Sequence, residues 1–338
     1  MSDQLLNVEG LVTAFQTEEG EIHAVDGVSF SVGKGRTVGL VGESGCGKTV
    51  TALSIIQLLP RPAASILAGK VLFEGEDLAA ASTERLHEVR GNRIGMIFQE
   101  PMTALNPVHR IGRQITEALK LHKDLSDAEA LQAAITMLDR VGIPSPEVRV
   151  SEYPHQLSGG MRQRVMIAMA LICDPALVIA DEPTTALDVT IQAQILGLLQ
   201  EMQDQLGTSI IMITHDLGVI AETCDDVVVM YAGRIAEQGT VEEVFNRPRH
   251  PYTRGLLASI PRLSTPRKSR LATIEGMVPA LTEMPAGCRF NNRCPHADEH
   301  CVAEYPDITD AKDGHLVACH KWRELEVVER SAGAPDDD

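Results

Sequence analysis

The chain lacks any long apolar run. Its longest, residues 165–173, is about half of the roughly 18 residues that a membrane-spanning helix needs. Residues 1–10 also lack the basic and apolar segments of a secretory signal. We therefore predict a cytosolic protein without a spanning helix, whose seven cysteines are reduced or bound to metal rather than joined in disulfides.

Positive charge is also scarce. The 30 Lys and Arg residues against 47 Asp and Glu residues give a formal net charge of −17 at pH 7. Because an acidic chain is not attracted to a phosphate backbone, we expect no nucleic acid among its partners. The length of 338 residues and the hydrophobic content of 44% suit a soluble protein with one full-sized domain and a smaller one.

A glycine-rich segment at residues 42–49 is the most informative part of the sequence. It fits the phosphate-binding pattern of two separated glycines followed by Lys and then Ser or Thr. The apolar residues 37–41 predict a buried strand before it, and residues 49–59 predict a helix that stops at Pro60. Glycine lets the backbone wrap around a phosphate, and the start of a helix directs free N–H groups at the anion.

This phosphate loop (residues 42–49) predicts that the chain binds ATP. Lys48 is expected to reach the β- and γ-phosphates, and the Thr49 hydroxyl is expected to bind Mg²⁺. Cys46 lies at a helix start beside Lys48, two conditions that lower the pKa of a thiol, although a small residue that contributes only its N–H is the simpler interpretation. The expected nucleotide-binding residues here are Gly42, Glu43, Ser44, Gly45, Cys46, Gly47, Lys48, Thr49 and Val50.

A pair of acids follows a second apolar segment. Residues 176–180 predict a buried strand, and Asp181 and Glu182 come directly after it. In an ATPase, Asp181 would point toward Mg²⁺ and Glu182 would activate the attacking water. Together with the phosphate loop, this segment predicts hydrolysis of the bound ATP.

A second anion-binding helix start is expected at residues 158–160. Ser158 is a good N-cap, and Gly159 and Gly160 expose the backbone at the start of an apolar helix. The phosphate loop of the same subunit cannot also use this helix start. We therefore expect it to cap the γ-phosphate held by another subunit.

These segments together resemble the ATPase subunits of ABC transporters, and the resemblance covers most of the chain. Phe15 lies where that family has an aromatic residue that stacks on adenine. Gln99 matches the glutamine that senses Mg²⁺ and contacts the membrane subunits, Asp188 matches the D-loop aspartate, and His215 matches the switch histidine. The resemblance implies that two subunits enclose two ATP molecules, with Glu182 polarising the water and His215 contacting the γ-phosphate.

Residues 249–257 resemble the His-Pro-Tyr segment of dipeptide and oligopeptide importer ATPases, whose relatives include nickel and glutathione importers. The resemblance implies three kinds of partner: a second, different ABC ATPase subunit, two transmembrane permease subunits and an extracytoplasmic peptide-binding protein. It also implies a peripheral location on the cytoplasmic side of the inner membrane. A soluble ABC ATPase of DNA repair or translation and an iron–sulfur redox sensor are the alternatives.

Four cysteines near the C-terminus are spaced C-x5-C-x6-C-x17-C, at Cys288, Cys294, Cys301 and Cys319. The step Cys294-Pro295 is typical of iron–sulfur ligation. The four positions also match a cysteine set that binds a [4Fe–4S] cluster in dipeptide-importer ATPases. Zinc and unligated thiols stay open, although the spacing lacks the close C-x2-C pairs of zinc ribbons.

The sequence thus predicts an α/β fold with a P-loop ABC ATPase core, a helical insertion and a small C-terminal cysteine-containing domain. The predicted domains are an ABC nucleotide-binding domain at 1–260 with a helical subdomain at about 100–170, a linker and four-cysteine metal-cluster domain at 261–333, and a disordered acidic tail at 334–338. Further strands are expected at 94–98, 177–180, 210–213 and 227–231, helices within 112–154, and a hairpin turn at 232–233.

Overall fold

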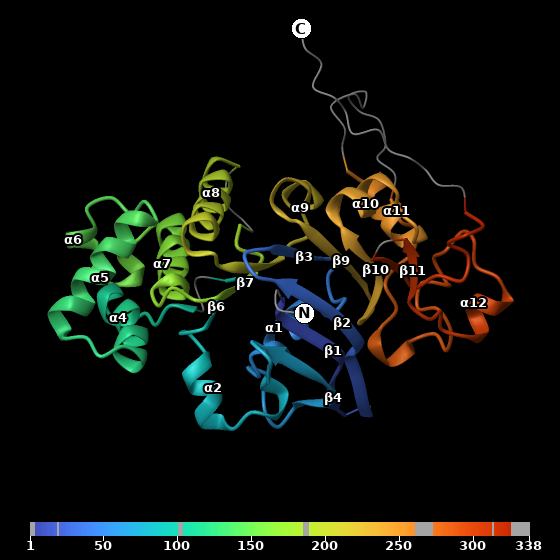
Figure 1. Cartoon of the computed structure of the whole chain (residues 1–338), viewed down its shortest axis with the longest axis horizontal. Coiled ribbons are helices and arrows are strands. Elements are labelled where there is room, and N and C mark those ends of the chain that lie inside the picture. Colours follow the sequence, from blue (N-terminus) through green and yellow to red (C-terminus); the bar gives the residue numbers. More distant parts are fainter. Residues whose placement is uncertain are drawn as a thin grey trace, which may run out of the picture. The chain divides into compact units, whose positions relative to one another are not determined.

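The computed structural model describes residues 4–18, 20–100, 104–184, 189–260, 273–312 and 314–325 (Figure 1). Contacts within the chain divide it into two compact units. The first unit comprises Met1–Leu6, Ser31–Thr37 and Phe73–Ile213, and the second comprises Asn7–Phe30, Val38–Leu72 and Thr214–Asp338.

Parallel strands run through the first unit. β6 (Ile94–Ile97) pairs with β7 (Leu177–Asp181), and β7 pairs with β8 (Ser209–Ile213), both in parallel. Every residue of β7 and β8 is buried, as expected of strands in a parallel sheet that is covered on both faces. Because the strands are parallel, the carboxyl ends of β7 and β8 lie at the same edge, and this edge carries Asp181.

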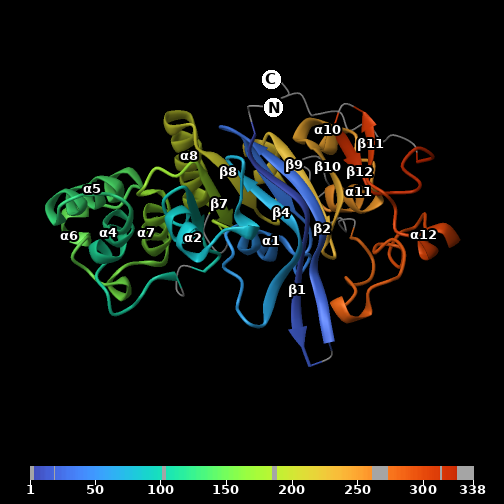
Figure 2. The ribbon, with the colours of Figure 1, turned by 60° about the horizontal axis from the view of Figure 1, so that its bottom comes forward.

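The first unit also contains a group of helices that lie together in both views (Figures 1 and 2): α4 (Ile111–His122), α5 (Asp127–Arg140), α6 (Pro146–Arg149) and α7 (Gly159–Leu171). α5 begins with a capping box, in which Ser126 and Glu129 each accept a hydrogen bond from the other's backbone N–H. The helices predicted within 112–154 are therefore confirmed.

The unit is completed by β5 (Glu76–Asp77), α2 (Thr83–Val89), α8 (Val189–Leu206) and two short 3₁₀ helices, Leu78–Ala80 and Pro154–Gln156. None of the described helices of the chain is long and apolar enough to cross a membrane.

The second unit is built around two sets of strands. β2 (Gly20–Gly33), β1 (Gln4–Thr17) and β4 (Ala64–Phe73) are neighbours in one sheet, and most of their residues belong to this unit. In the other set, β3 (Thr37–Val41) is buried throughout and pairs in parallel with β9 (Asp226–Tyr231). The helices of this unit are α1 (Lys48–Ile55), α9 (Leu217–Thr223), α10 (Val241–Asn246), α11 (Pro251–Ala258) and α12 (Glu299–Ala303), with a 3₁₀ helix at Leu281–Glu283.

The C-terminal segment extends the second set of strands. β9 and β10 (Arg234–Thr240) form an antiparallel hairpin through Ala232 and Gly233, whose positive φ values of 48° and 84° suit a tight two-residue turn. β12 (His315–Val317) then pairs with β10, and β11 (Thr309–Lys312) pairs with β12 (Figure 2). The described part of the cysteine-containing segment is therefore joined through β12 to the β9–β10 hairpin.

The structure confirms the predicted strands and the predicted hairpin turn. One prediction was wrong, because α1 ends at Ile55 and not near Leu59. Ile56 leaves the helical region of φ and ψ, and Gln57 has a left-handed φ of 50°, which turns the chain before Pro60 is reached. The predicted linker and the acidic tail lie outside the described residues, so the predicted domain limits stay predictions.

Candidate functional site

Three glycines give the phosphate loop its shape. Gly42, Gly45 and Gly47 have positive φ values of 150°, 79° and 99°, which residues with a side chain rarely adopt. A Cβ atom at Gly42 would lie 2.2 Å from the carbonyl oxygen of Met230, and one at Gly47 would lie 2.6 Å from the carbonyl oxygen of Ala24. A Cβ atom at Gly45 would have no neighbour within 4 Å, so this part of the loop is open to a ligand.

Lys48 begins α1 and folds back over the phosphate loop. Its Nζ donates hydrogen bonds to the carbonyl oxygens of Gly42 at 2.8 Å and Glu43 at 3.1 Å, and the residue is 7% exposed. Thr49, the next residue, is exposed. An ammonium group at a helix start attracts anions, so the arrangement suits the phosphate-binding role expected of Lys48.

Cys46 is fully buried within the loop. Burial raises the pKa of its thiol, and the nearby Lys48 offsets this effect only in part. Of the two interpretations of Cys46, the lowered pKa is therefore wrong, because lost hydration of the thiolate outweighs the attraction of the ammonium group. Its sulfur would lie 2.7 Å from a Cβ atom at Gly42, so Cys46 acts here as a small packed residue.

Three of the predicted residues meet in the first unit. Asp181 ends β7 and is 2% exposed. Glu182 follows with a left-handed φ of 49°, and its N–H donates to the carbonyl oxygen of Ile213 at 2.9 Å. Oε2 of Glu182 accepts a hydrogen bond from Nε2 of Gln99 at 3.0 Å. The left-handed backbone conformation costs a residue with a side chain about 1–2 kcal/mol of conformational free energy. The surrounding structure therefore holds Glu182 in this conformation beside Gln99.

Gln163 belongs to the same site, although the sequence analysis did not single it out. It lies on α7, is 1% exposed, and its side-chain amide donates a hydrogen bond to the carbonyl oxygen of Pro183, directly after Glu182. A buried polar side chain normally has a partner. Gln163 stands between Arg162 and Arg164, so no local pattern in the sequence marks it as buried. Gln163 thus connects the helix that begins after Ser158 to the segment that carries Glu182.

Ser158 is the N-cap of α7, as predicted. Its Oγ accepts a hydrogen bond from the N–H of Met161 at 3.3 Å. Ser158 and Gly159 are exposed, and a Cβ atom at Gly159 would have no neighbour within 4 Å. Gly160 is equally open, because a Cβ atom there would approach nothing closer than Ile191 Cγ2 at 4.0 Å. The start of α7 is therefore free of packed side chains.

The remaining predicted nucleotide residues are dispersed. Phe15 lies on β1 and Val50 lies on α1, both half-buried. Asp188 lies outside the described residues. Contacts of Phe15 with adenine and of Asp188 with a second subunit stay predictions.

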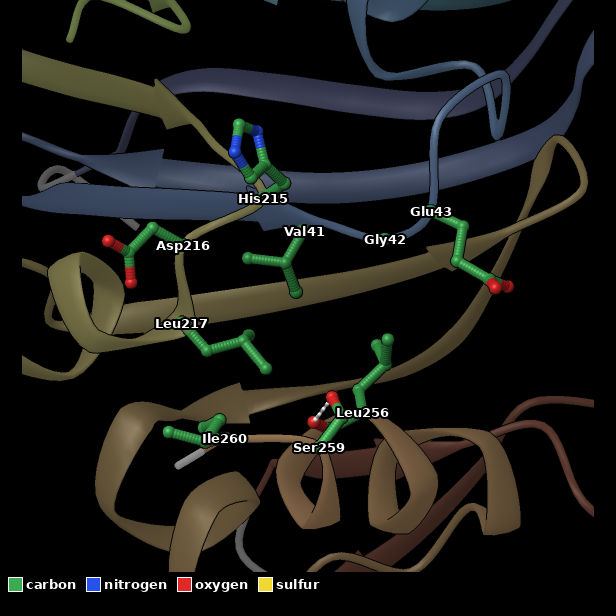
Figure 3. Close-up of a pocket in the computed structure, with 9 residues that line it drawn as sticks. All are labelled: Val41, Gly42, Glu43, His215, Asp216, Leu217, Leu256, Ser259 and Ile260. Atoms are coloured by element: carbon green, nitrogen blue, oxygen red, sulfur yellow. Dashed lines mark hydrogen bonds between the residues drawn. The ribbon is translucent and has the colours of Figure 1, made fainter. Parts of the chain in front are cut away.

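His215 is exposed and lines a cavity of about 410 Å³ in the second unit (Figure 3). The cavity joins His215 to Gly42 and Glu43 of the phosphate loop. The other lining residues are Val41, Asp216, Leu217, Leu256, Ser259 and Ile260. Leu256 belongs to the His-Pro-Tyr segment, and Ser259 and Ile260 follow it closely. Their place in the cavity was missed, because only the fold brings α11 to the loop.

A buried carboxylate holds the His-Pro-Tyr segment. Glu237 is 0% exposed and accepts hydrogen bonds from the backbone N–H groups of Arg249 at 2.6 Å and His250 at 2.9 Å. Nε2 of His315 lies 2.7 Å from Oε1 of Glu237. Burial lowers the pKa of His250 to about 4, so its ring is neutral, and its Nδ1 accepts the N–H of Tyr252. The segment therefore has a structural role in fixing Tyr252.

The seven cysteines are all free, and the four C-terminal ones lie in the second unit. Burial raises the pKa of each of these four thiols, to about 11 for Cys288 and about 12 for Cys319. Repulsion from neighbouring cysteine thiolates adds to the shift of Cys288, Cys294 and Cys319. Backbone N–H groups two and three residues further on donate toward the sulfurs of Cys288 and Cys294. As the side chains lie, no group of three or more His, Cys, Asp or Glu residues in the described ranges is arranged to hold a metal ion.

The glycine loop before α1 and the parallel strand β7, which ends at Asp181, belong to an α/β fold. The ABC transporter family matches residues 25–185, and the C-terminal region of the oligopeptide/dipeptide transporter family matches residues 236–301. The chain is 55% identical to a probable peptide ABC transporter ATP-binding protein of Sinorhizobium fredii, over 97% of each chain. It is 51% identical to the dipeptide transport ATP-binding protein DppD of Bacillus subtilis, over 99% of each.

A solved structure shares the fold. It is a dimeric ATP-binding cassette in a post-hydrolysis state bound to ADP and Pi, with a TM-score of 0.64 and 24% identity, covering 70% of this chain and 98% of that one. The chain therefore belongs to the ABC transporter family, as an ATP-binding subunit that hydrolyses ATP.

Proposed function

We propose that this subunit drives the import of dipeptides and oligopeptides through a membrane permease. The observation that carries the proposal is the match of residues 236–301 to the C-terminal region of oligopeptide/dipeptide transporters. Relatives named for peptide transport align over nearly the whole chain. The alternatives are nickel and glutathione importers. They would carry a different substrate from peptide importers but would use ATP in the same way.

In this proposal ATP binds at the phosphate loop. Lys48 neutralises the β- and γ-phosphates. Thr49 and Asp181 are the residues that would hold Mg²⁺, which would supply further positive charge at these phosphates. Glu182 polarises the attacking water, while His215 contacts the γ-phosphate. The hydrogen bond from Gln99 to Glu182 supports these roles, because it orients the carboxylate and links it to a residue expected to sense Mg²⁺.

A second subunit completes the site in this proposal. The start of α7, where Ser158 and Gly159 are exposed and Gly160 is half-buried, would cap the γ-phosphate that a second, different ABC ATPase holds. The other partners are two transmembrane permease subunits and, through them, an extracytoplasmic peptide-binding protein. The pair of ATPases would lie peripherally on the cytoplasmic side of the inner membrane.

Isolation of the complex tests this function. An affinity-tagged chain, extracted from membranes in mild detergent, should carry two integral membrane proteins and a second ATPase. In proteoliposomes the complex and its binding protein should take up labelled dipeptide when ATP is supplied. Uptake of Ni²⁺ or glutathione, without peptide uptake, would favour the alternative importers. Recovery with DNA or ribosomes, and without membrane proteins, would contradict transport altogether.

We also propose that the four C-terminal cysteines hold a [4Fe–4S] cluster, with zinc as the alternative. The donor set suits iron–sulfur chemistry, because backbone N–H groups already point at the sulfurs of Cys288 and Cys294, as they do around cluster ligands. Raised thiol pKa values also mean that a metal would be needed to hold these sulfurs as thiolates. The side chains of Cys288, Cys294, Cys301 and Cys319 would have to close further around the metal, given their present arrangement.

Metal analysis of the anaerobically purified protein checks the cluster. We expect about four irons per chain and a broad absorption band near ~400 nm, both lost in Cys288→Ser. Cys173→Ser is the matched control, because Cys173 is a buried thiol of the first unit, and it should keep iron and colour. One zinc per chain without colour would overturn the iron–sulfur assignment, and absence of both metals would leave four unligated thiols.

A further inference from the structure

An arginine beside one of the C-terminal cysteines reaches the phosphate loop. Arg293, directly before Cys294, forms a two-point ion pair with Glu43, with Nη1 2.6 Å from Oε2 and Nη2 3.0 Å from Oε1. The Arg293 side chain is 3% exposed and that of Glu43 is 30% exposed. Such paired contacts between a guanidinium and a carboxylate fix direction as well as distance.

The guanidinium of Arg293 is held in one orientation by further acceptors. Nε donates to the carbonyl oxygen of Glu275 at 2.9 Å, and Nη2 donates to that of Ile274 at 3.3 Å. Nη1 lies 3.3 Å from the hydroxyl of Tyr231. Because these bonds restrict the rotation of its side chain, Arg293 presents a fixed cation to Glu43.

The other polar groups of Glu43 are held as well. Its N–H donates to the hydroxyl of Tyr252 at 2.8 Å, and its carbonyl oxygen accepts from Nζ of Lys48. Burial raises the pKa of Tyr252 far above its usual value, so this hydroxyl stays neutral. The carboxylate, the N–H and the carbonyl oxygen of Glu43 therefore each have a hydrogen-bond partner. Arg293 and Tyr252, which bind the first two, lie outside the loop.

An aromatic cluster fastens the cysteine-containing segment at this place. The ring of Phe290 lies 5.1 Å from that of Tyr231 and 5.4 Å from that of Tyr252, and these two tyrosine rings lie 4.7 Å apart. Arg289, the neighbour of Phe290, makes an ion pair with Asp26. The segment between Cys288 and Cys294 thus packs against the residues that border the loop.

We propose that Arg293 and Tyr252 are positioning residues for ATP: they fix the first turn of the phosphate loop, and Arg293 neutralises the Glu43 carboxylate beside the triphosphate. Without Arg293 an uncompensated negative charge would stand next to a site for a highly anionic ligand, and Coulomb repulsion would oppose binding. The inference rests on the assignment of the phosphate loop proposed above.

Nucleotide titrations and steady-state hydrolysis test the proposal. Arg293→Ala should raise the ATP dissociation constant on the order of 10–10²-fold, since losing a hydrogen-bonded contact to a charged group changes an equilibrium constant by about this factor. KM should rise more than kcat falls, because the loop holds the phosphates in the ground state and the transition state alike. Arg293→Lys, which keeps the charge but loses the two-point geometry, should recover part of the affinity. Tyr252→Phe should give a smaller loss.

The charge argument makes a separate prediction. In Arg293→Ala the loss of affinity should be greatest at low salt, where the Debye length is about 30 Å, and should shrink at physiological salt, where it is about 8 Å. Glu43→Gln added to Arg293→Ala removes the unpaired carboxylate and should restore part of the affinity, namely the part lost to charge repulsion. A purely structural role for Arg293 predicts no recovery in this double variant.

Lys321→Ala is the matched control, because Lys321 forms ion pairs with Asp298 at 2.5 Å and Glu324 at 3.4 Å within the same C-terminal segment. It should leave the ATP dissociation constant unchanged. Wild-type affinity in both Arg293→Ala and Tyr252→Phe, or equal losses in Arg293→Ala and Lys321→Ala, would overturn the proposal. If Arg293→Ala fails to fold, Arg293→Lys and Tyr252→Phe replace it in the test. A weaker ATP affinity in these two variants supports the proposal, and wild-type affinity in both overturns it. Normal ATP binding by Lys48→Ala would instead show that the loop assignment itself is wrong.

Discussion

Glu182→Gln is expected to bind ATP as the wild type does and to release phosphate about 10²–10⁴-fold more slowly, the usual effect of removing a general base. The substitution keeps the size of the side chain and a carbonyl oxygen that Gln99 Nε2 can still reach at the present distance of 3.0 Å. What it removes is the negative charge that we propose polarises the attacking water. Calorimetric binding of ATP and phosphate release under single-turnover conditions measure the two effects separately.

Glu147→Gln is the control for this substitution. Glu147 lies exposed on α6 in the same unit, so its replacement removes one carboxylate without touching the site. It should hydrolyse ATP at the wild-type rate. Near-normal phosphate release by Glu182→Gln would show that another group activates the water.

Lys48→Ala is expected to weaken ATP binding by about 10–10²-fold, because a hydrogen bond to a charged group contributes about 1.5–3 kcal/mol. Turnover should fall further, by about 10²–10³-fold, since the ammonium group also stabilises charge that develops in the transition state. The carbonyl oxygens of Gly42 and Glu43, which now accept from Nζ, would be left to water. Fluorescent-nucleotide titration and steady-state hydrolysis measure both losses.

Lys70→Ala is the matched control, because Lys70 is an exposed lysine on β4. It changes the net charge by the same amount and should not alter ATP affinity. If Lys48→Ala and Lys70→Ala bound ATP equally well, the phosphate loop would not be the site of the nucleotide.

The parts of the site that the sequence predicted are those set by neighbouring residues. Gly42 and Gly47 need positive φ values in the loop, and the strand before Asp181 is a continuous apolar run, so both are visible in a few consecutive letters. The alternative of a lowered Cys46 pKa is wrong, because the helix start is visible locally whereas the burial that raises the pKa of the thiol depends on distant elements.

The parts that were missed depend on topology. Arg293 and Glu43 are separated by 250 positions, and Tyr252 and Glu43 by 209, so no local pattern relates them. Gln163 reaches Pro183 only because α7 and the end of β7 are packed together. The His-Pro-Tyr segment was recognised from its letters, but its function as a support for Tyr252 required the buried carboxylate of Glu237.

The pairing of β12 with β10 has a consequence for self-association. In the described part of the chain β11 is the outermost strand of its sheet. It has four residues, its pairing with β12 is irregular, and Asp310 and Lys312 are exposed, features that discourage a strand of another molecule from adding to it. A chain cut before β11 would instead present the seven-residue β10 as an open edge, with unpaired backbone groups available to a second copy. The C-terminal segment thus protects the ATPase from aggregation as well as bordering its phosphate loop.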